Sequence, residues 1–174
     1  MWDFEIVKNI KMLVLDVDGV MTDGGLYYDE EGRVFRRFDV QDGAGIKLAQ
    51  EAGLKIAVIS GLNSNSILKR LNDLKIEDYF LGCKDKVKAL KDLCKKYKLK
   101  LKEVAFLGDD WVDAHAMRIV GFPIAVKNAQ PEIKKLASWV TSSCGGHGAV
   151  REAIMFILNI QGKYVELWNK WKNF

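Results

Sequence analysis

Residues 11–20 read KMLVLDVDGV, and this stretch decides the fold that the sequence predicts. Its first part, residues 11–17, is a short apolar run rich in β-forming residues that leads into acidic groups, which is typical of a buried parallel strand. Residues 55–60 (KIAVIS) and 104–107 (VAFL) repeat the apolar run, and the latter is followed by Gly108-Asp109-Asp110. Ligands of parallel sheets bind beyond the carboxyl ends of the strands, so the polar residues at these ends are the first candidates for a site.

Helix and turn signals fill the sequence between these runs. Residues 24–39 alternate apolar and polar side chains around Asp29-Glu30-Glu31-Gly32, which predicts a β-hairpin with Gly32 in its turn. Alternating strands and helices predict an α/β fold, a doubly wound, mostly parallel sheet flanked by helices. We expect a single domain over residues 1–174 that ends in a helical tail from about 148 to 174. The expected helices are 43–52, 63–74, 85–97, 111 to about 120 and 148–160, with a helical turn from Pro131, and the other expected strands are 79–81, 122–126 and 139–141.

The acidic residues after two of the strands predict a metal site. Asp16, Asp18 and Asp109 would open into one crevice of a doubly wound sheet. Burying several carboxylates together is unfavourable unless a cation neutralises them, and an oxygen-only ligand set suits Mg²⁺ better than zinc. The turn at Gly19 lets Asp18 swing away from Asp16, so one carboxylate can bind metal while the other handles a proton.

Phosphate-binding groups follow in the same order along the chain. Ser60 and Gly61 place a hydroxyl and free amides after the second strand, close to an expected helix start. Lys86 lies at another helix start, and Asp113 lies one turn beyond Asp109. A nucleophile, an acid or base, phosphate donors, a lysine and a metal site are the components of metal-assisted phosphoryl transfer.

These residues carry a family resemblance. Asp16-Val17-Asp18-Gly19-Val20, Ser60-Gly61, Lys86 and Gly108-Asp109-Asp110-Trp111-Val112-Asp113 resemble the four motifs of the haloacid dehalogenase superfamily. The resemblance implies that Asp16 accepts the phosphoryl group, Asp18 is the general acid/base, Ser60 binds phosphate and Lys86 stabilises charge. It also implies that Asp16, the backbone carbonyl of Asp18 and Asp109 hold Mg²⁺, with Asp113 in support.

A narrower resemblance covers about residues 9–160. Thr22-Asp23-Gly24, the stretch DGAGIKL at residues 42–48 and GGHGAVRE at residues 145–152 are similar to the 3-deoxy-D-manno-octulosonate 8-phosphate phosphatase family. The short hairpin connection leaves no room for a cap domain, and that family is capless. The resemblance implies a homotetramer whose hairpins form a central barrel, a neighbouring subunit that helps to close each site, and a role in lipopolysaccharide synthesis.

Three positions depart from the pattern of that family. Leu62, Gln41 and His147 stand where many relatives have arginine, so each departure removes a fixed cation. The carboxylate of a sugar acid would then be bound by Arg70 or Arg151, and His147 is itself a candidate for contact with the substrate. The phosphatase chemistry is unaffected by these departures, whereas the identity of the sugar phosphate depends on them.

Charge and composition argue against nucleic-acid binding and membrane association. A net charge of +4 is small, and the dense basic stretch at residues 84–102 is spread around an expected helix, so we expect no nucleic-acid partner. Three cysteines (Cys83, Cys94 and Cys144) without CxxC spacing indicate reduced thiols, and no apolar run is long enough for a signal peptide or a membrane span. We therefore expect a cytoplasmic protein without membrane contact.

Two alternatives stay open beside the leading hypothesis of a Mg²⁺-dependent phosphatase for an eight-carbon sugar acid phosphate. One keeps the chemistry and changes the substrate to a nine-carbon sialic-type sugar 9-phosphate. The other is a non-catalytic module for oligomerisation. The apolar side of the hairpin is expected to pair with copies of itself, and Trp168, Trp171 and Phe174 are expected to mark packing or a subunit contact.

Overall fold

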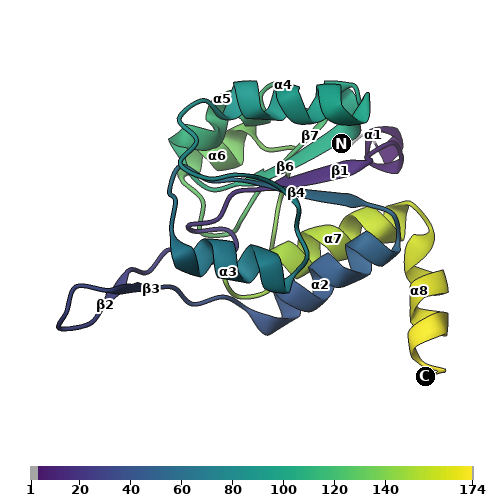
Figure 1. Cartoon of the computed structure of the whole chain (residues 1–174). Coiled ribbons are helices and arrows are strands. Elements are labelled where there is room, and N and C mark those ends of the chain that lie inside the picture. Colours follow the sequence, from purple (N-terminus) through teal and green to yellow (C-terminus); the bar gives the residue numbers. More distant parts are fainter. Residues whose placement is uncertain (1–3, 174) are drawn as a thin grey trace.

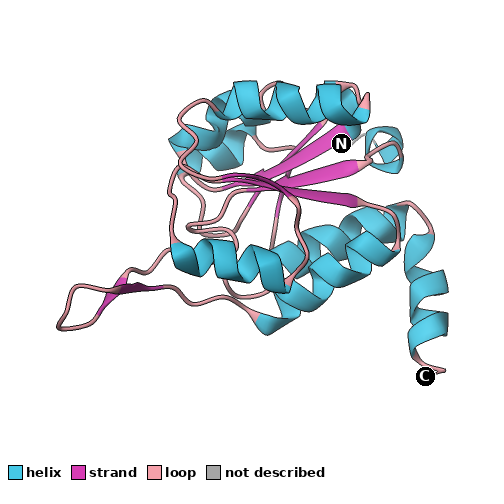
Figure 2. Cartoon of the chain, in the orientation of Figure 1, coloured by secondary structure: helices cyan, strands magenta, loops and turns pink. Residues whose placement is uncertain are grey.

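A computed structural model describes residues 4–173 and shows a parallel six-stranded sheet between two layers of helices (Figures 1 and 2). The strand order is β5-β4-β1-β6-β7-β8, with every neighbouring pair parallel. The predicted α/β class is confirmed. The strands of this sheet are β1 (Met12–Leu15), β4 (Lys55–Ile59), β5 (Asp78–Phe80), β6 (Val104–Gly108), β7 (Phe122–Ala125) and β8 (Trp139–Val140).

The strand at the centre of the sheet is β1, whose four residues are all buried. It pairs with β4 on one side and β6 on the other, with Leu15 level with Val58 and Leu107. A strand with neighbours on both sides and helices on both faces has no solvated face, which explains its unbroken apolar run. The three strands therefore end at one edge of the sheet, and the residues that follow them lie near one another.

Helices cover both faces of the sheet. In Figure 1, α4, α5 and α6 lie on one face, and α2, α3 and α7 lie on the other. The sequence order reverses at β1, as in doubly wound sheets. The helices are α1 (Phe4–Lys8), α2 (Val40–Glu51), α3 (Asn65–Asp73), α4 (Lys86–Tyr97), α5 (Ala114–Met117), α6 (Pro131–Leu136), α7 (Ala149–Ile160) and α8 (Lys163–Trp171), with single 3₁₀ turns η1 (Leu101–Glu103) and η2 (Trp111–Asp113).

Two predicted helices differ from the structure by three residues at one end, and the other bounds of the predicted helices differ by at most two residues. Helix α2 begins at Val40 instead of residue 43, because the Asp39 side chain caps it by accepting hydrogen bonds from the amides of Gln41 and Asp42. The helix expected to reach residue 120 is the short turn η2 followed by α5, which ends at Met117. The carboxylates of Asp110 and Asp113 satisfy amides at the start of this segment, which favours a tight turn over a longer helix.

The predicted hairpin is present and projects from the carboxyl edge of the sheet (Figure 1). Its strands β2 (Tyr27–Tyr28) and β3 (Val34–Phe35) pair over two residues each, and Gly32 has a φ of 77° in the turn between them. All four strand residues are exposed. A two-stranded ribbon this short has little stability of its own.

The tail of the chain lies at the opposite end of the molecule. Gln161, after α7, donates from its side chain to the carbonyls of Val7 and Ile10, just before β1 begins. Helix α8 therefore starts at the amino edge of the sheet, away from the hairpin of the same chain (Figure 1). Among the described residues, no helix combines the length and the apolar character of a membrane span. Phe174, which the sequence grouped with Trp168 and Trp171, lies outside the described residues.

Candidate active site

The four motifs converge at the carboxyl edge of the sheet. Asp16 follows β1, Ser60 follows β4 and Asp109 follows β6, while Lys86 is the first residue of α4. The Asp16 amide donates to the carbonyl of Leu107, so the pairing of β1 with β6 continues up to the acidic residue. The central pairing of the sheet thus fixes Asp16 beside the end of β6.

Lys86 joins two of the carboxylates. Its Nζ lies 2.5 Å from Asp16 Oδ1 and 2.7 Å from Asp113 Oδ1, and all three side chains are buried. Burial alone would lower the pKa of Lys86, but the two carboxylates outweigh it and the pKa lies above its ordinary value. The ammonium group is therefore charged and holds Asp16 in place.

Asp113 connects this ion pair to the loop after β6. Its Oδ2 accepts hydrogen bonds from the amides of Asp109 at 3.0 Å and Asp110 at 3.4 Å, while its Oδ1 is bound to Lys86. Both oxygens of Asp113 are thus engaged within the chain. The carboxylate orients the loop and the lysine, and the support of the metal that the resemblance implies for Asp113 stays a prediction.

The charge at this site is not balanced by Lys86 alone. Burial, followed by the nearby charge of Asp113, raises the pKa of Asp16 to about 7. Burial, followed by the charges of Asp16 and Asp113, raises the pKa of Asp109 to about 8. The Oδ1 of Asp109 is buried without a hydrogen-bond partner. Such groups are stabilised as carboxylates when a cation lies between them.

The donor set fits a hard divalent cation. One oxygen each from Asp16, Asp109 and Asp113 lies within 4.8 Å of the others. Gly19 leaves space beside Asp109, since a Cβ at this position would lie 2.2 Å from Asp109 Oδ2. Oxygen ligands with an unpartnered carboxylate oxygen among them suit Mg²⁺. Of the predicted ligands, Asp16 and Asp109 belong to this group, and the backbone carbonyl of Asp18 stays a prediction.

The side chain of Asp18 turns away from the acidic group. Its Oδ1 accepts a hydrogen bond of 2.7 Å from Nε of Arg36, which follows β3 of the hairpin. Asp16 and Asp18 therefore have separate partners, as the turn at Gly19 led us to expect. Arg36 is not among the predicted site residues, because the alternation in residues 24–39 predicts only a hairpin. The signal was a pair of arginines, Arg36-Arg37, where apolar alternation ends.

Ser60 and Gly61 directly follow β4 at the carboxyl edge of the sheet. Ser60 is buried, and its Oγ accepts a hydrogen bond of 3.2 Å from the amide of Leu62. A side chain at Gly61 would meet open space. The helix start expected here lies farther along, because Ser64 caps α3. The amides near Ser60 are therefore those of a loop, and the proposed phosphate contact rests on the hydroxyl and on this loop.

Arg70, His147 and Arg151 are predicted to bind the sugar acid, but within the described chain they contact other groups of the protein. Arg70 donates to the carbonyl of Asp39 at 2.7 Å, and its Nε is buried without a partner. His147 is exposed beside Arg37, which also bonds the carbonyl of Gly146. The glycine-rich turn packs closely on the loop after β1, where a Cβ on Gly145 would clash with the Gly19 carbonyl.

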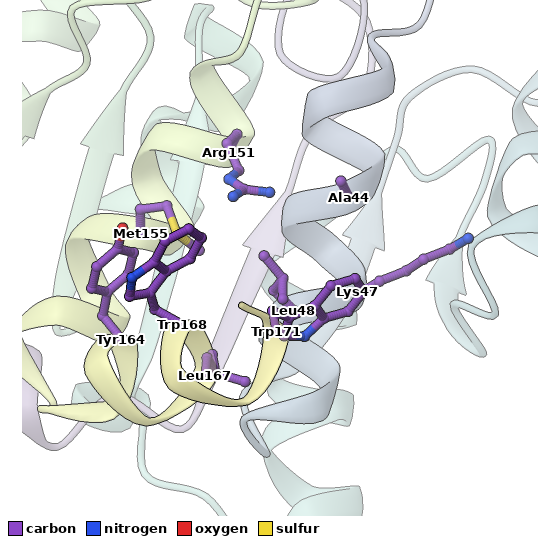
Figure 3. Close-up of a pocket in the computed structure, with 9 residues that line it drawn as sticks. All are labelled: Ala44, Lys47, Leu48, Arg151, Met155, Tyr164, Leu167, Trp168 and Trp171. Atoms are coloured by element: carbon purple, nitrogen blue, oxygen red, sulfur yellow. The ribbon is translucent and has the colours of Figure 1, made fainter. Parts of the chain in front are cut away.

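Arg151 lies apart from the acidic group. It lines an apolar cavity of about 320 Å³ between α2, α7 and α8, which Met155, Trp168 and Trp171 also line (Figure 3). Its backbone amide donates to Asp42 Oδ1 at 2.8 Å. None of Arg70, His147 and Arg151 bonds to the acidic group in the described chain, so their predicted contacts with substrate stay predictions.

Comparisons with known proteins agree with this geometry. A family model for haloacid dehalogenase-like hydrolases matches residues 83–154. The 3-deoxy-D-manno-octulosonate 8-phosphate phosphatase of Haemophilus influenzae is 41% identical over 157 residues, which are 90% of this chain and 87% of that protein.

Two solved structures of such phosphatases are also similar. The enzyme from Moraxella catarrhalis, in complex with magnesium, phosphate and a KDO molecule, has a TM-score of 0.93 and 34% identity over 97% of either chain. The cobalt-bound form of the Haemophilus influenzae enzyme has a TM-score of 0.88 and 41% identity, covering 91% of this chain and 93% of that chain.

Proposed function

This chain belongs to the 3-deoxy-D-manno-octulosonate 8-phosphate phosphatase family of haloacid dehalogenase-like hydrolases, and from that membership we propose that it hydrolyses 3-deoxy-D-manno-octulosonate 8-phosphate to the free sugar acid and phosphate. The observation that carries the proposal is the buried ion pair of Asp16 with Lys86, set beside Asp109 in a chain with this degree of identity. The product is the sugar acid used in lipopolysaccharide synthesis.

The reaction takes place in two steps on Asp16. A carboxylate oxygen of Asp16 attacks phosphorus, the bond from phosphorus to the sugar oxygen breaks, and that oxygen keeps the electron pair and takes a proton from Asp18. Water then attacks phosphorus and gives a proton to Asp18, and the electron pair of the phosphorus–Asp16 bond returns to the carboxylate. Asp18 thereby acts as acid in the first step and as base in the second.

Charge neutralisation and positioning complete the site. Ser60 and the amide of Gly61 bind phosphate oxygens, and Lys86 balances charge on Asp16 and the phosphoryl group. Asp16, Asp109 and the carbonyl of Asp18 would hold Mg²⁺. When bound, this ion neutralises the carboxylates and the phosphate oxygens so that nucleophile and phosphate can approach.

A nine-carbon sialic-type sugar 9-phosphate is the second candidate substrate. Three cations of the family pattern are missing, at Leu62, Gln41 and His147. The contacts with the sugar therefore differ from those of many relatives, which is the reason to test a second substrate. Arg70 keeps a buried Nε without a partner, which could donate to a substrate carboxylate after a local change of conformation. Arg151, which lines the cavity beside α8, would reach a substrate only from a neighbouring subunit or after a change of conformation. The exposed His147 stays a candidate contact.

We also propose that the active form is a homotetramer assembled through the hairpins. The exposed side chains of Leu26, Tyr27, Tyr28, Val34 and Phe35 support this, because an isolated two-residue ladder does not bury them. A neighbouring subunit at this edge would also shield the phosphorylated Asp16 from bulk water. The cytoplasmic location stays a prediction from the cysteines.

A comparison of kcat/KM tests the proposed function. The purified protein is assayed with Mg²⁺ on the eight-carbon 8-phosphate, the nine-carbon 9-phosphate and a neutral hexose 6-phosphate, with release of phosphate as the readout. We expect the eight-carbon substrate to have the highest value. A higher value for the nine-carbon compound would change the substrate, and no turnover of any ester would favour the non-catalytic module.

A further inference from the structure

Arg36 is the one buried cation contributed by the hairpin segment within the described residues 24–39. Its side chain is 5% exposed, whereas Phe35, its neighbour in sequence, is an exposed residue. The chain thus leaves the exposed ladder at β3 and immediately turns a charged side chain inward. A buried guanidinium requires partners that compensate for lost water, and Arg36 has three.

The partners of Arg36 lie on two sides of the site. Nε donates to Asp18 Oδ1 at 2.7 Å, and Nη1 donates to Ser64 Oγ at 3.1 Å and to Ser66 Oγ at 3.3 Å. Ser64 is the cap of α3, a helix packed on the body of the sheet, and the hairpin emerges beside this end of α3 in Figure 1. Because a guanidinium is planar and rigid, anchoring one edge to α3 fixes the direction of the other edge.

The bond from Arg36 distinguishes the two oxygens of Asp18. Oδ1 is engaged by Nε, and within residues 4–173 no hydrogen bond engages Oδ2. The carboxylate is 28% exposed, so it remains open to a bound ester or to water. Lys86 cannot orient Asp18 in the same way, since its Nζ is bound to Asp16 and Asp113.

We propose that Arg36 is the positioning residue of Asp18: it holds Oδ1 and presents Oδ2 to the oxygen that leaves. This inference rests on the proposed function. The proton on Oδ2 moves to the sugar oxygen as that oxygen takes the electron pair of the broken bond to phosphorus, and Oδ2 later receives a proton from the attacking water. Arg36 exchanges no proton and acts only through the orientation of Asp18.

The leaving group provides the test. An alkyl oxygen such as that of a sugar needs a proton as it departs, whereas 4-nitrophenolate departs without one. The value of kcat/KM covers the steps up to departure of the leaving group. Arg36→Gln should therefore lower kcat/KM for the sugar phosphate roughly 10- to 100-fold, part of the effect of a positioned acid, and lower that for 4-nitrophenyl phosphate much less. Arg36→Lys should recover part of the loss.

A double variant separates positioning from a general structural effect. If Arg36 acts through Asp18, adding Arg36→Gln to Asp18→Asn should cause little further loss, because the orientation of an inactive group no longer matters. Arg33→Gln is the matched control, since Arg33 is an exposed hairpin arginine paired with Asp29 and Glu31. Thermal unfolding and light scattering of each variant establish that fold and assembly are retained.

Three results would overturn the inference that Arg36 positions Asp18. Equal losses for both esters, or additive losses in the double variant, would reduce Arg36 to a structural contact and overturn the inference. A change in KM confined to carboxylated substrates would make Arg36 a substrate ligand and would also overturn it. In all of these cases the wild-type protein turns over the sugar phosphate, so the proposed function stands. A wild-type protein without turnover would overturn both.

Discussion

Within the described residues, one lysine lies among three carboxylates at this site, of which Asp16 and Asp113 are buried and Asp109 is half-buried. Lys86 contacts Asp16 and Asp113 directly, and Asp109 keeps one buried oxygen without a partner. Because a buried charge is costly without a counter-charge, the raised pKa values of Asp16 and Asp109 mark where a cation belongs. The chemistry of each residue therefore follows from its neighbours, and single substitutions test it.

Asp16→Asn should abolish turnover and leave the fold intact. An amide cannot accept the phosphoryl group, and it carries no charge to bind the cation. The measurement is phosphate release with the sugar phosphate, together with thermal unfolding. Asp73→Asn is the control, because Asp73 is an exposed carboxylate paired with Lys69. Appreciable residual activity in an uncontaminated Asp16→Asn preparation would remove Asp16 from the role of nucleophile.

Asp18→Asn should lower kcat on the order of 10²- to 10⁴-fold, which is the usual effect of removing a positioned acid or base. Both leaving-group protonation and hydrolysis of the phosphorylated Asp16 should slow. The rate is measured across pH 5 to pH 9, together with the amount of phosphorylated protein after rapid quenching. A wild-type rate at every pH would exclude Asp18 as the acid/base.

At the scale of elements, the two projecting segments of the chain differ in how they are held. Helix α8 is tied to α2 through Glu51, which bonds Lys170 and Trp171, and its Trp168 and Trp171 line the cavity shown in Figure 3. The hairpin has a two-pair ladder and exposed apolar side chains. The tail therefore has packing partners in its own chain, whereas the hairpin is the segment that we propose pairs with another subunit.

Replacing Val34 and Phe35 with Asp should dissociate the proposed tetramer. Negative charges on the exposed ladder would repel their copies and remove apolar area from the interface. We expect kcat/KM for the sugar phosphate to fall far more than that for 4-nitrophenyl phosphate, since Asp16, Asp18, Ser60 and Lys86 belong to one chain. Light scattering measures the assembly, and Glu30→Gln at the hairpin turn is a control. A monomeric wild-type protein with full activity would contradict the prediction.

At the scale of the whole molecule, the core does not depend on the metal site. The apolar cluster extends from Val7 on α1 to Leu158 on α7 and includes all residues of β1. A chain of this length buries enough surface to fold without a metal. The acidic group lies at one edge of the sheet, beyond this core, so its charge adjusts stability without determining the fold.

Removal of metal should stop activity and leave the protein folded. Addition of EDTA should reduce phosphate release to background, because the charges of Asp16 and Asp109 then oppose the approach of a phosphate. Circular dichroism should retain its helical signal, and added Mg²⁺ should restore activity. Unfolding on chelation would show that the cation is structural.

Stability without metal should decrease as pH rises from about 4 to about 8. The folded-state pKa values are about 7 for Asp16, about 8 for Asp109 and about 6 for Asp42, mainly through burial. In this window the folded state binds protons that the unfolded chain has lost, so the free energy of unfolding falls with pH. Mg²⁺ should stabilise more at pH 8 than at pH 5, since it binds the deprotonated groups.

Urea unfolding in EDTA at several pH values measures this effect. Asp109→Asn should show a weaker dependence on pH, because the group with the most strongly raised pKa no longer titrates. The pKa of Lys86, raised by its carboxylate partners, affects stability only at alkaline pH above this window. A stability that rises with pH in EDTA would contradict the prediction.

The sequence by itself determined the class of fold, the hairpin and the grouping of motifs at one edge of the sheet. These follow from local patterns, since apolar runs, turn glycines and the alternation of strands with helices specify a parallel sheet, and parallel strands end together. Asp16, Asp109 and Lys86 could be grouped for that reason. The roles assigned to the site residues came from the family resemblance and remain predictions.

Only the tertiary structure decided the contacts between segments whose relative path is not set locally. Arg36 meets Asp18 across 18 positions and Ser64 across 28, and this depends on how the hairpin returns to the body. The position of Arg151, which lines an apolar cavity beside α8, also depends on the packing of distant segments. The raised pKa values of Asp16 and Asp109 likewise depend on burial and on charges brought close by the fold. Propensity and spacing act over a few residues, whereas burial and charge pairing act through space.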